Sequence, residues 1–179
     1  MNGASREPLA LAAVETPFGA MRIACSDVGL VLLALPGREA GQFSRRLEAI
    51  QTPDAAASPR AAAYAAQTGE ELAGYFAGAL REFSVPLAPR GTAFQRVVWQ
   101  AVCAVPYGET RSYGAVAAAI GRPAAFRAVG HANGANPLPV IVPCHRLVGS
   151  TGALTGYGGG LQMKRWLIEQ ERCNSRSAT

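Results

Sequence analysis

The chain has 179 residues, of which 49% are hydrophobic and 16% are charged. This composition excludes an intrinsically disordered chain and suffices for one sizeable core or two small ones. Apolar runs such as Leu30–Leu35 fall far short of the roughly 20 residues that a membrane-spanning helix needs. The apolar piece Pro8–Val14 is short and followed by Glu15, which does not fit a signal peptide, so the cytoplasm is the expected location.

The net charge of +5 is unevenly distributed. Residues 1–90 carry 8 basic and 9 acidic side chains, whereas residues 91–179 carry 9 basic and 3 acidic ones. A cationic second half predicts a domain that binds a polyanion such as nucleic acid. The alternative is an arginine-rich composition with no role in binding, since Lys164 is the only lysine.

The cysteines and histidines do not have the spacing of a structural metal site. They are Cys25, Cys103, Cys144, Cys173, His131 and His145. No C-x-x-C pair occurs among them, so no zinc site is predicted. Scattered cysteines without an export signal do not indicate a disulfide framework either.

Residues 1–88 are predicted to form a small α/β domain. Apolar runs separated by Gly, Pro and Asp predict an antiparallel β-meander, and two helices follow, the second placed by the spacing of Leu72, Phe76 and Leu80. The predicted strands are Leu9–Glu15, Met21–Ser26 and Leu30–Leu35, and the predicted helices are 40–50 and 60–80. Residues 83–87 are expected to return as an edge strand. No motif in this domain indicates a chemical activity.

A linker at residues 86–91 is predicted to lead into the second domain, residues 89–179. Thr92 and Gln95 have the spacing of a capping box, which predicts the start of a helix that Pro106 ends. The expected apolar face of this helix is Phe94, Val97, Val98, Ala101, Val102 and Val105, with Trp99 and Cys103 packing on or beside it.

Two shorter helices are predicted next. Ser112 is a suitable N-cap for a helix over 113–120 that Gly121 ends, and Pro123 opens another over 123–133. Together they are a candidate helix-turn-helix, a motif that binds DNA. A plain αα-hairpin is the alternative.

The segment 136–146 carries the candidate chemistry. Its three prolines exclude a helix and predict a stiff, extended chain that holds Cys144 in a fixed position. A thiolate is the nucleophilic form of cysteine, and nearby positive charge favours it. Adjacent side chains of an extended chain point to opposite sides, so His145 is expected to reach Cys144 through a water. The alternative is a buried structural cysteine beside a surface histidine.

The last predicted helix, 161–171, places Met163, Leu167 and Glu171 on one face. A carboxylate on an apolar face needs a partner, and a histidine is a natural one. The cysteine, His145 and Glu171 would then act as nucleophile, base and orienting group. The glycine-rich stretch before this helix is either a loop whose backbone approaches a ligand or a mobile connector.

The central motif resembles a known active-site signature. Pro143-Cys144-His145-Arg146, with Asn136-Pro137 before it and Gly156-Tyr157-Gly158-Gly159-Gly160 after it, resembles that of the O6-alkylguanine-DNA alkyltransferases. The resemblance extends over about 94–171 and includes Pro106-Tyr107-Gly108-Glu109-Thr110, Ser112-Tyr113 and Arg127-Ala128-Val129-Gly130. The first domain resembles the family only in layout.

The resemblance implies an α/β N-terminal domain of ribonuclease-H-like layout and a mainly α, winged helix-turn-helix-like C-terminal domain. It implies an irreversible, single-turnover transfer of an alkyl group from O6 of guanine, or O4 of thymine, in duplex DNA to the protein's own cysteine. Base flipping and minor-groove binding belong to that activity. No cofactor, metal, membrane or obligate protein partner is implied; a monomer is expected, and cooperativity on DNA is left open.

The resemblance also implies roles for individual residues. Cys144 takes the alkyl group, His145 acts as base through a water, and Glu171 orients His145. Tyr113 donates a hydrogen bond to N3 of guanine, and Asn136 holds the hinge between the recognition helix and the active-site segment. The implied DNA-binding residues are Arg127, as the finger that replaces the flipped nucleotide, with Tyr113, Arg122, Ser150 and Gly130. The implied pocket residues are Tyr157, Gly158, Leu147 and Val148.

Two positions depart from the family pattern. Some relatives bind a structural zinc in the N-terminal domain, which Cys25 alone cannot do. After Tyr157, where some relatives have a hydroxyl residue, Gly158 leaves only a backbone amide to contact O6 and predicts a roomier pocket. Two other functions remain compatible with the sequence: a lesion-binding protein that transfers nothing, and a cysteine hydrolase or acyltransferase that uses the same three side chains.

Overall fold

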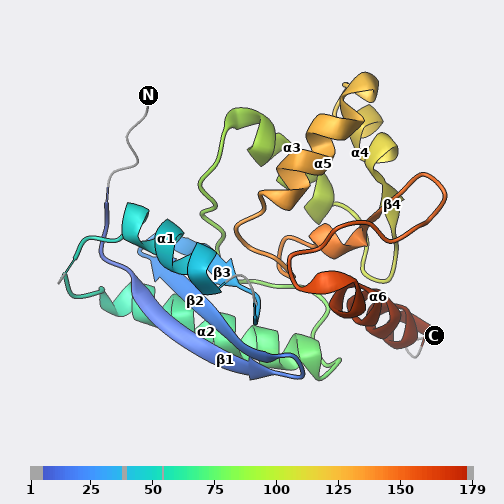
Figure 1. Cartoon of the computed structure of the whole chain (residues 1–179). Helices are drawn as coiled ribbons and strands as arrows, with labels where there is room; N and C mark the ends of the chain where they lie inside the picture. The colour runs from blue at the N-terminus through green and yellow to red at the C-terminus, as the bar shows by residue number, and fades with distance from the viewer. Residues whose placement is uncertain (1–5, 38–39, 54, 177–179) are drawn as a thin grey trace. The chain divides into compact units, whose positions relative to one another are not determined.

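The chain folds into two compact units. The computed structural model describes residues 6–37, 40–53 and 55–176. One unit ends at Arg90 and the other starts at Gly91, inside the linker predicted at residues 86–91. Over the described residues the protein is α/β, with small sheets and six α-helices (Figure 1). No helix in this part of the chain is long and apolar enough to cross a membrane.

The first unit contains the predicted β-meander, an antiparallel sheet in the order β1-β2-β3. Its elements are β1 (Ala10–Thr16), β2 (Gly19–Ser26), β3 (Gly29–Ala34), α1 (Ala40–Ile50) and α2 (Pro59–Phe76). Successive strand residues face opposite sides of a sheet. Accordingly, Ala24 packs in one cluster with Phe43 of α1, whereas the neighbouring Cys25 contacts Thr68 of α2. The two helices therefore cover opposite faces of the sheet (Figure 1).

Helix α2 ends at Phe76, not at Leu80 as predicted. Gly78 has a φ of +77°, and the Leu80 N–H donates to the Gly74 carbonyl at 3.1 Å. A left-handed glycine of this kind ends a helix because it turns the chain back onto the last carbonyls. The predicted spacing holds for Leu72 and for Phe76, which is half-buried, but not for Leu80, which lies beyond the end of the helix. The buried face is Ala61, Ala65, Thr68, Leu72 and Tyr75.

The edge strand predicted at residues 83–87 is wrong. In the described chain this segment makes a single parallel bridge, between Leu87 and Leu30. The Leu30 N–H donates to the Pro86 carbonyl and the Ala88 N–H donates to the Leu30 carbonyl, each at 2.8 Å. Pro86 has no N–H, so the ladder does not continue.

The second unit is mainly helical, with one short parallel pair of strands. Its elements are α3 (Ala93–Cys103), β4 (Arg111–Ser112), α4 (Tyr113–Ala119), the 3₁₀ turn η1 (Pro123–Ala125), α5 (Phe126–Gly134), the 3₁₀ turn η2 (Cys144–Arg146), β5 (Leu147–Val148) and α6 (Gly160–Arg176). Helices α3, α4 and α5 pack against one another, and α6 contacts η2.

Helix α3 starts with the predicted capping box. The Thr92 N–H donates to Gln95 Oε1 at 2.9 Å, and the Gln95 N–H donates to Thr92 Oγ1 at 3.2 Å. Trp99 is buried, and its Nε1 donates to the Ala132 carbonyl of α5 at 2.9 Å. The expected apolar face is partly wrong, because Val97 is 46% exposed and Cys103 is exposed.

The two short helices form as predicted, with one difference. Ser112 caps α4 by accepting the Ala115 N–H at 3.0 Å, and Gly121, with φ +72°, follows the helix end. The third predicted helix is divided. It begins as the 3₁₀ turn η1, in which the Ala125 N–H donates to the Arg122 carbonyl at 2.8 Å, and only then becomes α5.

Candidate active site

Cys144 lies in a 3₁₀ turn, η2, not in the extended chain that the prolines predicted. A tight turn precedes it, where Val140 has a φ of 76° and Pro139 bridges to Val142. The Arg146 N–H then donates to the Pro143 carbonyl at 2.9 Å. With about three residues per turn, neighbouring side chains diverge by roughly 120° and do not point to opposite sides. Prolines exclude a helix, but they are compatible with turns.

Two asparagine side chains hold this segment. Asn136 Nδ2 donates to the Val142 carbonyl and Asn136 Oδ1 accepts the Leu138 N–H, both at 2.9 Å. Asn133, which sequence reasoning did not identify, donates through Nδ2 to the Cys144 carbonyl at 3.3 Å. Both asparagines are buried at the end of α5 or just after it. The chain around Cys144 is therefore tied to α5 by side-chain amides.

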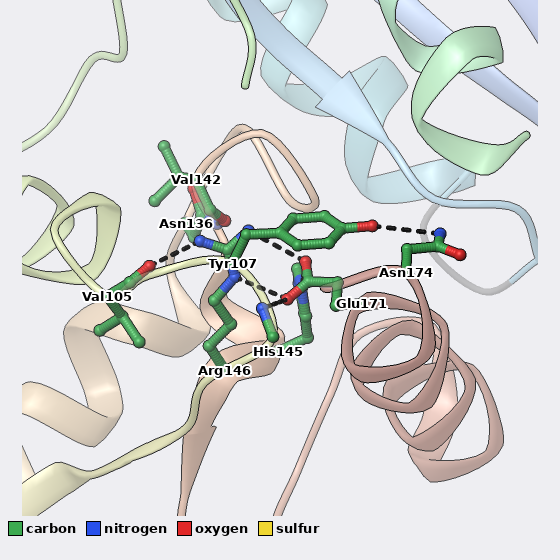
Figure 2. A network of polar contacts seen from close by, with 9 residues as sticks. Val105, Tyr107, Asn136, Val142, His145, Arg146, Glu171 and Asn174 are labelled. Atoms are coloured by element: carbon green, nitrogen blue, oxygen red, sulfur yellow. Dashed lines mark hydrogen bonds and ion pairs between the residues drawn. The ribbon is translucent and has the colours of Figure 1, made fainter. Parts of the chain in front are cut away.

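Glu171 of α6 is the centre of a buried polar network (Figure 2). Its Oε1 lies 2.9 Å from His145 Nε2, the contact that the sequence predicted. Arg146 donates two hydrogen bonds to the same carboxylate, from Nε at 2.9 Å and from Nη2 at 3.0 Å. Its Nη1 donates to the Val105 carbonyl at 2.6 Å. The Gly108 N–H donates to Oε2 at 3.1 Å. The partners of the carboxylate thus include His145, Arg146 and the backbone of Gly108, of which only His145 was expected.

The network favours a neutral histidine beside an ionised carboxylate. Burial would raise the pKa of Glu171, but His145 and Arg146 outweigh it and lower that pKa to about 2. Burial lowers the pKa of His145 below its ordinary value, against the opposing effect of Glu171. Because the carboxylate can only accept, Nε2 carries the imidazole proton, and Nδ1 is the basic nitrogen of the ring.

We expect this network to make the protein sensitive to acid. The pKa of Glu171 is lower in the folded protein, so its carboxylate contributes fully to the stability of the fold above the ordinary pKa of 4.5. That contribution is lost as the pH falls toward about 2. His145 also lowers the free energy of unfolding as the pH falls. Its pKa is lower in the folded protein, so the histidine of the unfolded chain takes up a proton at a higher pH than that of the folded chain. The free energy of unfolding from urea titrations, measured at a series of pH values, should therefore fall through this window. A value that stays constant there would contradict the predicted ionisation of Glu171.

A pocket of about 470 Å³ opens between α4, α5 and the glycine-rich loop. Its lining residues are Tyr113, Phe126, Arg127, Gly130, Asn133, Gly134, Thr155, Gly156, Tyr157 and Gly158. Tyr157 joins the pocket to the network, because its ring lies edge-on to His145 with centroids 6.5 Å apart. Asn133 joins it to the Cys144 carbonyl. Two lining residues of the pocket, Asn133 and Tyr157, therefore contact the turn that carries Cys144 and His145, although neither of those two residues is itself in the lining.

The remaining predicted site residues are more scattered. Leu147 and Val148 are buried in β5, and in the described part of the chain neither of them lines this pocket. Arg122 is exposed, with its guanidinium 5.6 Å from the centre of the Phe94 ring. Ser150 is exposed in the turn after β5. Arg127 and Gly130 lie on α5 and line the pocket with Tyr113.

Lys164 is a buried cation that sequence reasoning missed. Its side chain is fully buried, and Nζ donates to the carbonyls of Leu147 at 2.5 Å and Thr155 at 2.9 Å. Burial lowers the pKa of Lys164, and the nearby Cys144 opposes that shift. Its position three residues before Leu167 on α6 is the signal that would have placed it on the buried face.

The other cysteines have different surroundings. Burial raises the pKa of Cys25 to about 11, against a contact with Thr68. Cys103 and Cys173 are exposed, and no cysteine of the described chain forms a disulfide. Over the same residues, no cluster of His, Cys, Asp and Glu has the arrangement of a metal site. Of the four cysteines, Cys144 alone is both buried and followed directly in sequence by a histidine.

Relatives of the chain were found by sequence. A family model described as the DNA-binding domain of 6-O-methylguanine DNA methyltransferase matches residues 93–173. A methylated-DNA–protein-cysteine methyltransferase of Methanosarcina barkeri is 41% identical over 163 residues, which are 91% of this chain and 97% of the relative. Another, from Mycolicibacterium paratuberculosis, is 56% identical over 118 residues, 66% of this chain and 70% of the relative.

Solved structures agree with these relatives. A crystal structure of Mycobacterium tuberculosis O6-methylguanine methyltransferase matches with a TM-score of 0.77 at 42% identity, covering 93% of this chain and 94% of that one. A crystal structure of M. tuberculosis OGT in complex with DNA matches with a TM-score of 0.76 at 41% identity, covering 90% and 92%. Since the M. barkeri relative aligns over almost its whole length, the chain belongs to the family of methylated-DNA–protein-cysteine methyltransferases.

Proposed function

We propose that Cys144 is the cysteine that accepts the alkyl group in this member of the family. The chain repairs DNA by transferring an alkyl group from O6 of guanine to itself, once per molecule. The observation that carries the assignment is the buried network in which His145, the neighbour of Cys144, contacts Glu171 at 2.9 Å beside a pocket. Intact-mass spectrometry of the chain before and after exposure to duplex DNA that carries O6-methylguanine tests it.

The proposed chemistry begins with removal of the thiol proton. The Cys144 proton passes through a water to His145 Nδ1, because Nε2 faces Glu171. The carboxylate of Glu171 keeps the ring in that tautomer and stabilises the imidazolium that forms. Arg146 neutralises the carboxylate of Glu171 when His145 is uncharged, so these two groups carry no net charge before the reaction.

Alkyl transfer then follows in one displacement. The thiolate attacks the alkyl carbon, a carbon–sulfur bond forms, the bond between that carbon and O6 breaks, and its electron pair goes to the guanine ring. Tyr113, which lines the pocket, donates a hydrogen bond to ring nitrogen N3, where part of this charge develops. The product is a thioether on Cys144, a poor leaving group, so each molecule reacts once.

Duplex DNA is the proposed substrate form, and α4 and α5 are the proposed helix-turn-helix of a winged C-terminal domain over 89–179. Residues 1–88 would be a ribonuclease-H-like supporting domain. Small residues on α5, including Gly130, permit close approach to the minor groove, and Arg127 would replace the flipped nucleotide. Extrusion of an alkylated base costs less than that of a normal base because its pairing is weak. Arg122 and Ser150 would contact the phosphate backbone of the duplex, to which the protein would bind as a monomer.

Replacement of Arg127 by alanine should slow repair of duplex DNA by about tenfold or more, because the gap left by the flipped base is no longer filled. Reaction with the free base O6-benzylguanine, which needs no extrusion, should stay close to that of the unaltered chain. Both rates are followed by mass spectrometry of the alkylated protein. Arg165→Ala, at an exposed position of α6 outside the pocket, is the matched control. An equal decrease in rate on both substrates would mean that Arg127 maintains the pocket or the fold and does not replace a flipped nucleotide.

A further inference from the structure

The hydroxyl of Tyr113 already has a side-chain partner across the pocket. Its Oη lies 3.0 Å from Thr155 Oγ1, and either atom can be the donor. Tyr113 begins α4, whereas Thr155 belongs to the glycine-rich loop before α6. Both residues line the 470 Å³ pocket. The contact therefore links the two walls between which a base would enter.

Thr155 is held in place by the buried lysine. Lys164 Nζ donates to the Thr155 carbonyl at 2.9 Å and to the Leu147 carbonyl at 2.5 Å. A buried ammonium group that lost these acceptors would remain desolvated without compensation, so the loop is anchored at residue 155. Leu147 follows η2 directly, and the same cation thereby joins the loop to the turn that carries Cys144. The backbone of Thr155 is consequently fixed relative to the turn that carries Cys144.

We propose that Thr155 is a positioning residue for Tyr113. When a base occupies the pocket, the Thr155 hydroxyl donates to Tyr113 Oη, and the Tyr113 hydroxyl donates to N3 of the guanine. A phenol oxygen can accept and donate at once, and hydrogen bonds in such a chain polarise one another. The proposal rests on the proposed function, since it needs Tyr113 to act on N3.

The chain of hydroxyls affects the reaction more than the binding of the base. Charge grows on the guanine ring as the bond to O6 breaks, so a better aligned phenol donor stabilises the transition state more than the bound lesion. Loss of one such hydrogen bond corresponds to about a fivefold lower rate. The effect should appear in the single-turnover rate constant at saturating DNA.

Thr155→Val and Thr155→Ser test this role, because valine keeps the shape of threonine without its hydroxyl and serine keeps the hydroxyl. On duplex DNA with O6-methylguanine, we expect Thr155→Val to be about fivefold slower and Thr155→Ser to be close to the unaltered chain. On the 3-deaza form of the lesion, where a C–H replaces N3, Thr155→Val should equal the unaltered chain. Thr151→Val, in the same loop but outside the pocket lining, is the matched control.

Tyr113→Phe separates the two proposals. Suppose that Tyr113→Phe slows transfer only for the lesion that has N3, and that adding Thr155→Val to Tyr113→Phe slows it no further. Both the action of Tyr113 on N3 and the positioning role of Thr155 are then supported. If Tyr113→Phe slows transfer but Thr155→Val does not, the role of Thr155 is refuted and that of Tyr113 remains. Equal slowing of both lesions by Thr155→Val would refute positioning, since it would mean a change in the loop itself. A Tyr113→Phe variant as fast as the unaltered chain would refute the action of Tyr113 on N3.

Discussion

Replacement of Cys144 by alanine is expected to abolish alkyl transfer. After incubation with duplex DNA that carries O6-methylguanine, the unaltered chain should gain the mass of one methyl substituent, and Cys144→Ala should gain nothing. The physical reason is that Cys144 directly precedes His145, a buried imidazole whose pKa is lowered by burial and whose Nε2 contacts Glu171. Intact-mass spectrometry, followed by mapping of the modified peptide, measures the result.

The other three cysteines provide matched controls. Cys25→Ala, Cys103→Ala and Cys173→Ala should each be methylated as the unaltered chain is, since Cys25 lies buried beside Thr68 in the first unit, and Cys103 and Cys173 are exposed. A methyl group found on any of these three would overturn the assignment of the nucleophile. Cys144→Ala should still bind the lesion, because the pocket lining does not depend on the thiol. Binding by both chains without transfer by either would instead describe a lesion-binding protein, and repeated turnover of a small ester would describe a hydrolase.

Replacement of Glu171 by glutamine should have the largest effect on stability. The side chain is 1% exposed, and the change leaves the buried Arg146 guanidinium facing a neutral amide. Removing one member of a buried ion pair costs about 3–5 kcal/mol. Transfer should also slow about a hundredfold or more, because His145 loses the group that orients it and stabilises its charged form. Urea unfolding measures the first effect, and single-turnover rates under conditions where the variant is folded measure the second.

Glu169→Gln is the control for this experiment. Glu169 lies on the same helix, α6, but is exposed, so its replacement should change the free energy of unfolding by no more than about 0.5 kcal/mol. Transfer should be unaffected. If Glu171→Gln resembled Glu169→Gln in both measurements, the buried network would have no role in either stability or catalysis, and the proposed base would have to be reassigned.

Several elements were predictable because their signals are local. The capping box of Thr92 and Gln95 and the N-cap at Ser112 depend on side chains within three residues of the backbone groups they bind. The pairing of Glu171 with a histidine also followed from local information, since the helical spacing from Met163 and Leu167 placed a carboxylate on a buried face. A buried charge requires a partner, and only two histidines exist in the chain.

The failures concern contacts between distant segments. The burial of Lys164 was missed, and its acceptors, the carbonyls of Leu147 and Thr155, are not encoded by any local pattern. Arg146 was part of the recognised motif, but its two-donor contact with Glu171 requires η2 and α6 to be adjacent. The edge strand at 83–87 failed because pairing with β3 depends on where Pro86 meets Leu30.

The sequence alone determined the candidate residues for the chemistry: a proline-framed cysteine followed by histidine, a carboxylate on the buried face of the last helix, and a cationic second half. Tertiary structure decided how these residues meet. It placed Cys144 in a 3₁₀ turn, gave Glu171 a second partner in Arg146, and brought Thr155 to Tyr113 across the pocket. The physical reason is that caps and helical faces are set by neighbours along the chain, whereas hydrogen bonds to backbone carbonyls across a core depend on packing, which no short segment specifies.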